Sequence, residues 1–340
     1  MRLRSTVTAG ISFVAVILGL ACLPLLSRSG NEAGAGWPSG TGTVTEIAAM
    51  HIARASHSST LLPNGKVLIA GGFAGSGGEY RPYASAELFD PGTGTFQAVT
   101  NMSVGRSAHT ASLLKNGKVL IVGGWTGMND LRGSAEIYDP ATGKFTLTGS
   151  MIEPRGSHTA TALKDGRVLI VGGGSGHYPS QTIYRPAEIF DPATGRFTLT
   201  GERSVGRHKH AAILLRSGKV LVVGGSDNRD WHGEYASAEL YDPASGTFSA
   251  TGPMSTPRFK LPEAVTLLPN GRVLVAGGGA FAELYDETTG TFTRVPGSLG
   301  AARFFASATL LPGGKALISG GYAESDSGLP ATPAAWLYQP

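Results

Sequence analysis

A block that ends in two glycines occurs six times in this chain and constrains its fold more than any other feature. The block is RVLIVGGG in its third copy, at 167–174, and the first glycines of successive pairs are 43 to 53 residues apart. These glycines are Gly71, Gly123, Gly172, Gly224, Gly277 and Gly320. A second block follows five of the pairs, and SAEIYDPATGKF at 134–145 is typical of it. Repeats with periods of about 20 to 50 residues predict a solenoid or a propeller, and the longest of these periods belong to propeller blades.

Each period contains four strand patterns. In the second repeat we expect strands over 109–114, 119–122, 135–138 and 144–148. Asn-Gly favours a tight hairpin between the first two strands, and Asp-Pro-Ala-Thr-Gly suits a turn between the last two. The apolar run Val-Leu-Ile-Val has no polar alternation, which is typical of a strand buried on both faces. One period is therefore predicted to be a four-stranded antiparallel meander.

Composition supports an all-β chain with a large core. Glycine supplies 50 of the 340 residues, about twice its usual share, whereas charged residues make up only 15%. Apolar residues make up 41%, which argues against intrinsic disorder. Cys22 is the only cysteine, so a disulfide framework is excluded. The formal net charge of +4 gives no reason to expect a nucleic-acid partner.

The two ends of the chain predict the number of blades. The last repeat stops after its third strand, and the segment GTGTVTEIAAMHIAR at 40–54 aligns without a gap with ATGKFTLTGSMIEPR at 141–155. A strand over 40–50 would therefore complete the last blade and remove both sheet edges. We expect an all-β, six-bladed propeller over residues 37–340, closed by an N-terminal strand.

Residues 1–36 have the pattern of an export signal. Arg2 and Arg4 precede an apolar run over 11–26, and Ala33-Gly34-Ala35 suits cleavage after Ala35. Two alternatives stay open, namely lipidation at Cys22 and retention of the segment as a membrane anchor. We expect an exported chain that is extracellular, periplasmic or at the cell surface, and that is a monomer.

The paired glycines, the aromatic residue that closes the third strand and the aromatic residue that starts the fourth resemble kelch repeats. The likeness covers residues 40–340 and is greatest to bacterial exported kelch proteins, within the superfamily of galactose-oxidase-type propellers. This resemblance implies the propeller fold but says little about activity. Galactose oxidase needs a cysteine crosslinked to a tyrosine, and its activity is excluded because no cysteine follows the leader. Sialic-acid mutarotase is similar in size and compartment, yet none of its catalytic motifs can be matched here.

The loops between the second and third strands vary in length and sequence, and they share one face of the predicted propeller. Function usually lies on such loops, because a rigid scaffold positions them. We call this side the variable-loop face. The predicted ligand-binding residues are Tyr83, Trp125, His177, Tyr178, Arg229, Asp230, Trp231, His232 and Arg303.

An Arg-x-x-His motif precedes the first strand in four repeats. Its histidines are His57, His109, His158 and His210. A residue repeated at one register usually serves what all blades need, so we predict a structural role for these histidines and no bound metal. Counting back from the turn of blade five places Lys260 in the arginine position and Glu263 in the histidine position. This pair is the best candidate for acid/base catalysis.

The third-strand glutamate of each blade is predicted to pair with the arginine. Blade six has Trp336 in place of that glutamate, so Arg303 is expected to be available to a ligand. The leading hypothesis is a binding module for an extracellular carbohydrate or protein, without a cofactor. The alternative is a sugar-converting enzyme, similar to a mutarotase or a lyase, with acid/base residues at the mouth of the channel.

Overall fold

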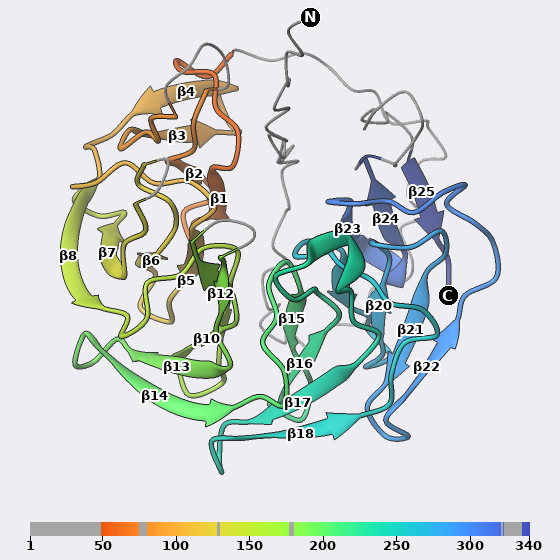
Figure 1. The fold of residues 1–340 in the computed structure, drawn as a ribbon. Helices are drawn as coiled ribbons and strands as arrows, with labels where there is room; N and C mark the ends of the chain where they lie inside the picture. Colours follow the sequence, from red (N-terminus) through yellow and green to blue (C-terminus); the bar gives the residue numbers. More distant parts are fainter. Residues whose placement is uncertain (1–48, 75–79, 128–129, 177–179, 321, 323–334) are drawn as a thin grey trace, which may run out of the picture.

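The computed structural model describes residues 49–340, except for 75–79, 128–129, 177–179, 321 and 323–334. Figure 1 shows six antiparallel sheets arranged in a ring around a central axis. The predicted six-bladed, all-β propeller is confirmed. Within the described residues no helix is long and apolar enough to span a membrane.

Five blades are four-stranded meanders in the described part of the chain. The strands of blades one to three are β1 (Ser58–Leu61), β2 (Val67–Ala70), β3 (Ala86–Asp90), β4 (Thr95–Ala98); β5 (Thr110–Leu113), β6 (Val119–Val122), β7 (Ser134–Asp139), β8 (Lys144–Ser150); β9 (Thr159–Ala162), β10 (Val168–Val171), β13 (Pro186–Asp191) and β14 (Arg196–Glu202). Those of blades four and five are β15 (Ala211–Leu214), β16 (Val220–Val223), β17 (Ala238–Asp242), β18 (Thr247–Thr251); β19 (Val265–Leu267), β20 (Val273–Val275), β21 (Glu283–Asp286) and β22 (Thr291–Arg294). The strands of blade two begin and end within two residues of their predicted bounds.

Blade six has three strands among the described residues, in the order β23 (Ser307–Leu310), β24 (Ala316–Ser319) and β25 (Ala335–Tyr338). Residues 40–48 of the strand predicted to complete this blade lie outside the described residues, so that part of the prediction is untested. The remaining elements are the short hairpin of β11 (Gly174–Ser175) and β12 (Thr182–Ile183), and the 3₁₀ turns η1 (Asp230–His232) and η2 (Pro312–Gly314).

The core lies between neighbouring blades. The second strands β6, β10 and β16 are buried along their whole length, as the absence of polar alternation predicts. Leu120 and Val122 of β6 pack against Val168 and Ile170 of β10, and the same arrangement recurs from blade one to blade six. Each fully buried aliphatic side chain stabilises the fold by roughly 1.5 to 3 kcal/mol.

The paired glycines allow the blades to approach each other closely. Gly71 has a φ of 69°, and a Cβ atom there would lie 2.4 Å from the carbonyl oxygen of Arg106 in the next blade. Only glycine avoids that clash, which explains why the pair recurs at the end of each second strand.

The first strands lie innermost, where each contacts the first strand of the next blade from β1 to β23 (Figure 1). The segments that enter the first strands therefore meet around the axis at one end of the channel. The two short turns of each blade lie on the opposite side, which we call the hairpin-turn face.

Candidate functional site

A buried arginine at the start of each of the first five blades binds its own sheet. In blade two, Arg106 donates from Nη1 to the carbonyl oxygens of Gly123 and Ser134, both at 2.9 Å, and from Nη2 to Glu136 at 3.1 Å. The buried ion pairs are Arg54–Glu87 (2.8 Å), Arg106–Glu136 (3.1 Å), Arg155–Glu188 (2.8 Å), Arg207–Glu239 (3.2 Å) and Arg258–Glu283 (2.6 Å). Burying a charge is costly unless it is paired and hydrogen-bonded. These pairs therefore stabilise the blades themselves, and we call the repeated arginines, their glutamates and the repeated histidines the frame.

The predicted alignment of blade five is wrong. Lys260 does not take the arginine position, because Arg258 forms the ion pair with Glu283. Glu263 does not take the histidine position, because Leu261 lies there.

The packing around the paired glycines shows that Leu261 takes the histidine position of blade five. A Cβ atom on Gly172 would lie 2.6 Å from Cε1 of His210, and one on Gly224, in the next blade, would lie 3.3 Å from Cδ2 of Leu261. The two additional residues of blade five, Pro262 and Glu263, thus follow the histidine position instead of preceding the arginine position.

Among the residues that the structure describes, three of the four repeated histidines form hydrogen bonds with the preceding blade. Nε2 of His109 lies 2.9 Å from the hydroxyl of Ser58 in blade one, and the same distance separates His158 from Thr110 and His210 from Thr159. This geometry fits the structural role that the repeat predicts, which replacement of the histidines would test.

Burial keeps these imidazoles neutral. Desolvation, followed by repulsion from the neighbouring arginine, lowers the pKa of His57 to about 4 and those of His109 and His158 to about 3. Desolvation also lowers the pKa of His210 well below its ordinary value. Within the described part of the chain, no group of three or more His, Cys, Asp or Glu could hold a metal ion.

Arg303 of blade six, which is predicted to be available to a ligand, makes two contacts within the protein, and its role in ligand binding stays a prediction. Its guanidinium lies 5.2 Å from the ring centroid of Trp336, the residue that replaces the third-strand glutamate. Nε also donates to the carbonyl oxygen of Leu299 at 3.2 Å. A cation–π contact thus takes the place of the ion pair in this blade.

Two of the predicted loop aromatics pack against the frame. The Tyr83 ring lies against the Arg54 guanidinium at 5.9 Å, and Arg155 and Arg207 make similar contacts with the equivalent tyrosines of blades three and four. Trp125 lies over Gly156, where a Cβ atom would be 2.8 Å from the indole nitrogen. His177 and Tyr178 lie outside the described residues.

The blade-four loop contains two acidic residues that pair within the protein. Arg229 donates two hydrogen bonds to Oδ2 of Asp227, from Nε at 3.0 Å and from Nη2 at 2.6 Å. Asp230 pairs with the Lys209 ammonium at 2.7 Å and with Nε2 of buried His208 at 3.1 Å. Despite desolvation, these two neighbours hold the pKa of the Asp230 carboxyl well below its usual range. Trp231 and exposed His232 follow in η1.

Six residues with positive φ surround the axis on the variable-loop face. They precede the histidine position of each blade and are Ser56, Ala108, Ser157, Lys209, Lys260 and Phe305, with φ between 49° and 56°. Backbone hydrogen bonds link them: Ala108 N donates to Ser56 O at 3.1 Å, Ser157 N to Ala108 O at 3.4 Å, and Lys209 N to Ser157 O at 3.3 Å. Leu261 N then donates to Lys209 O at 3.3 Å, and Phe305 N to Lys260 O at 2.6 Å. We call these six residues the inner ring.

The inner ring is lopsided. Blades one to three contribute two serines and an alanine, whereas blades four to six contribute two lysines and a phenylalanine. The Lys260 side chain is buried, and its ammonium donates to the Tyr322 hydroxyl at 2.8 Å. The rings of Phe259, Phe304 and Tyr322 lie 4.9 to 5.7 Å from that ammonium. Such aromatic faces stabilise a cation that has lost its water.

Glu263 adds a carboxyl group at the same half of the ring. Its backbone oxygen accepts a hydrogen bond from Ala308 N in blade six, at 2.9 Å. Its side chain is exposed, yet the protein that surrounds it raises the pKa of the carboxyl by desolvation. The structure describes no ion pair between Glu263 and Lys260, although both lie at the start of blade five.

Sequence reasoning missed two features. The inner ring is defined by the positive φ of six residues, and in the sequence these residues can be found only as those that precede each histidine position. Arg203, fully buried in blade four, takes a position that is methionine in blades two, three and five. Its Nη2 donates to Tyr184 O at 2.7 Å, but its Nε and Nη1 have no hydrogen-bond partner in the described part of the chain.

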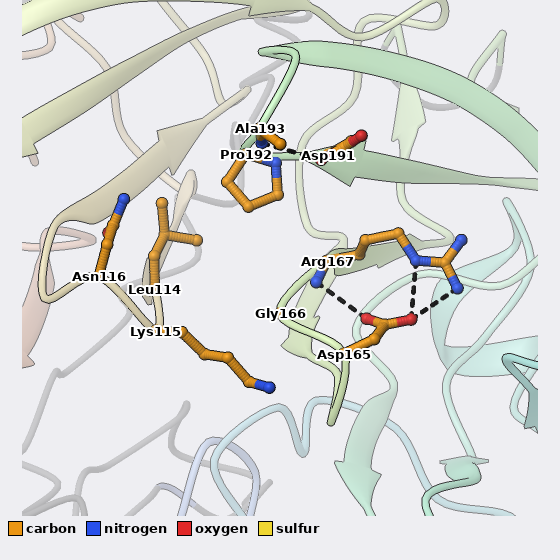
Figure 2. A pocket seen from close by; sticks show the side chains of 9 residues that line it. All are labelled: Leu114, Lys115, Asn116, Asp165, Gly166, Arg167, Asp191, Pro192 and Ala193. Carbon is orange, nitrogen blue, oxygen red and sulfur yellow. Dashed lines mark hydrogen bonds and ion pairs between the residues drawn. The ribbon is translucent and has the colours of Figure 1, made fainter.

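A pocket of about 300 Å³ lies on the hairpin-turn face, between the turns of blades two and three (Figure 2). It is lined by Leu114, Lys115, Asn116, Asp165, Gly166, Arg167, Asp191, Pro192 and Ala193. None of these residues was among the predicted site residues.

A family model of the Kelch motif matches residues 54–103 and 106–152, which correspond to blades one and two. Comparison with curated proteins gives no significant match. The ion pair recurs in five blades and the paired glycines in all six. The chain is therefore a six-bladed β-propeller, and its first two blades match the Kelch motif.

Proposed function

We propose that this chain is a binding module whose ligand sits on the variable-loop face, at the half of the inner ring formed by blades four to six. Kelch propellers generally bind proteins or smaller ligands. The observation that carries this proposal is the lopsided ring, because Lys209, Lys260 and Phe305 stand where blades one to three have small residues. Residues that depart from the repeat on one side of the ring give that side a chemistry of its own, with which a ligand can be recognised.

A carbohydrate fits this chemistry best. Sugars stack their C–H faces on aromatic rings and exchange hydrogen bonds through their hydroxyls. Phe305, which is partly exposed, lies with its ring centroid 5.9 Å from that of Tyr322. The Lys209–Asp230 pair and the Glu263 carboxyl supply donors and acceptors nearby. A protein ligand is the other outcome that the experiment can reveal.

The test is a glycan array and a peptide array probed with the full chain, followed by titration of the selected ligand. We expect binding to a glycan, and at least a tenfold weaker affinity when Lys209→Ser and Glu263→Gln are combined. Serine is the residue of blades one and three at the Lys209 position, so the melting curve should change little. Ala108→Ser, on the other half of the ring, serves as the matched control. Unaltered affinity of the double variant would refute the site, and selection of peptides alone would refute the carbohydrate.

A sugar-converting enzyme is the second candidate, and the raised pKa of Glu263 favours it. A carboxyl that stays protonated at higher pH can act as a general acid. The test is NMR exchange spectroscopy of the anomers of array-selected sugars with the wild-type chain and with Glu263→Gln. Acceleration that depends on Glu263 would establish this function, and its absence would leave the binding module.

We further propose that the chain is exported, on the basis of the leader pattern over 1–36. N-terminal sequencing of the mature protein and mass analysis of Cys22 would distinguish cleavage after Ala35, lipidation and retention.

A further inference from the structure

A cation in the first turn of a blade pairs with the last residue of the third strand in four of the first five blades. The pairs are Lys66–Asp90 (3.0 Å), Lys118–Asp139 (2.9 Å), Lys219–Asp242 (3.6 Å) and Arg272–Asp286 (3.2 Å). Each ion pair thus joins the first turn of a blade to the end of its third strand on the hairpin-turn face. Within the repeat, the usual partner of the third-strand aspartate is therefore the cation of the first turn.

Blade three breaks this pattern. Its turn cation, Arg167, instead grips Asp165 of its own turn, with Nε and Nη2 2.8 and 2.7 Å from Oδ2 (Figure 2). Blades one, two and five have asparagine at the Asp165 position, so only here does a carboxylate compete for the cation. Arg167 also reaches Pro243 O in blade four, at 3.4 Å.

Asp191 thereby forms no ion pair with its turn cation, although Arg167 remains close enough to attract it electrostatically. Oδ1 accepts a hydrogen bond from Ala193 N at 2.8 Å, but the carboxylate forms no ion pair in the part of the chain that the structure describes. Asp191 lines the pocket of about 300 Å³, opposite Lys115. Lys115 does not fill this place, because its ammonium donates to Lys164 O and points away from Asp191 in Figure 2.

We infer that this pocket binds a ligand with a protonated amine or a guanidinium on an alkyl stem, in the place that the turn cation occupies in the other blades. Asp191 would accept the cationic group, and Leu114 and Pro192 offer apolar surface to the stem. The shared chemistry fits a free alkylamine and the lysine or arginine side chain of a partner. Lys115 on the facing wall disfavours a second positive charge on the ligand. This site lies on the face opposite the proposed ligand site and is independent of it.

The experiment is an NMR titration of the ¹⁵N-labelled full chain with n-butylammonium and with Nα-acetyl-lysine-N-methylamide. We expect saturable shifts of the amides at 165–167 and 191–193, with a Kd on the order of 1 mM. Butyrate and butanol, which keep the stem but lack the cation, should give no saturable shift. Tighter binding of the lysine derivative than of butylammonium would indicate a side chain of a partner, whereas equal binding would indicate a free amine.

Two substitutions test the mechanism. Asp191→Asn should weaken binding at least tenfold, whereas the matched change Asp139→Asn in blade two, where Lys118 is the partner, should not. Asp165→Asn leaves Asp191 intact but releases Arg167 to pair with it, so binding should also fall at least tenfold. Melting curves of all three variants verify that they are folded. The proposal is overturned if no saturable shift appears up to 100 mM amine, or if either pocket variant binds like the wild type.

Discussion

Blades two and five are built on the same buried ion pair but differ in the residues that meet the axis. Arg106 and Arg258 are fully buried, and each pairs with the glutamate of its own third strand. In blade two, His109 then bonds to the neighbouring blade. In blade five, Leu261 fills the same space without a polar contact, and Lys260 enters the ring where blade two has an alanine.

The difference separates two kinds of position. Those of the buried Arg–Glu ion pair are the same in five blades, because every blade must bury the same surface and satisfy the same carbonyl groups. Those of the inner ring change between blades, from small residues in blades one to three to Lys209, Lys260 and Phe305 in blades four to six. Changes that gather in blades four to six therefore indicate a site, whereas the repeated arginines and histidines indicate a frame.

The largest effect should come from breaking the frame in either blade. Glu136→Ala and Glu283→Ala each leave a buried arginine without its carboxylate, and we expect each to lower the free energy of unfolding by about 3 to 5 kcal/mol. Urea unfolding would measure both losses. A loss in blade five less than half of that in blade two would mean that the two ion pairs are not equivalent.

A smaller effect of opposite sign is expected at Arg203. Its buried Nε and Nη1 lack partners within the described residues, and unsatisfied buried donors cost roughly 1 to 3 kcal/mol each. Arg203→Met, which installs the residue of blades two, three and five, should therefore stabilise the chain by about 1 to 3 kcal/mol in urea unfolding. The reverse change in blade three, Met151→Arg, should destabilise it. If Arg203→Met does not stabilise the chain, Arg203 has a role in the frame.

The histidines predict a further difference between blades two and five, in the response to acid. His109 has a folded-state pKa of about 3, below the value near 6.5 of an unfolded chain, so below pH 6.5 the unfolded state binds the additional proton. Its contribution is thus complete above pH 6.5 and is lost as the pH falls towards 3. His109→Leu, which imitates blade five, should reduce the slope of unfolding free energy between pH 5 and 6 by up to about 1.4 kcal/mol per pH unit. An unchanged slope in urea unfolding across this range would mean that His109 is protonated in the folded protein.

Much of the fold could be predicted from the sequence, because the repeat encodes contacts that each blade makes locally. The glycine pair, the Asn-Gly turn and the apolar run of β6 each have one structural solution, and together they define a blade. The strand predicted to complete blade six could not be tested in this way, since it lies outside the described residues.

The site was less predictable, because locating it requires knowing where the two additional residues of blade five are inserted. Counting back from the turn of blade five assumes that all first strands begin alike, and Pro262 and Glu263 violate that assumption. A better signal was present: Met254 precedes Arg258 by four residues, as Met102 precedes Arg106. No spacing in the sequence indicates that Asp165 draws Arg167 away from Asp191, because this choice is made between two nearby carboxylates.

Hydrogen–deuterium exchange of the full chain, with and without its array-selected ligand, tests the central claim most directly. We predict that the ligand slows exchange in peptides that contain Lys209, Lys260 to Glu263 and Phe305. The matching peptides around Ser56, Ala108 and Ser157 should exchange as before, since the proposed ligand contacts only the half of the inner ring that blades four to six form. Equal protection around the whole inner ring, or protection confined to the hairpin-turn face, would contradict the claim that the departures of blades four to six form the site.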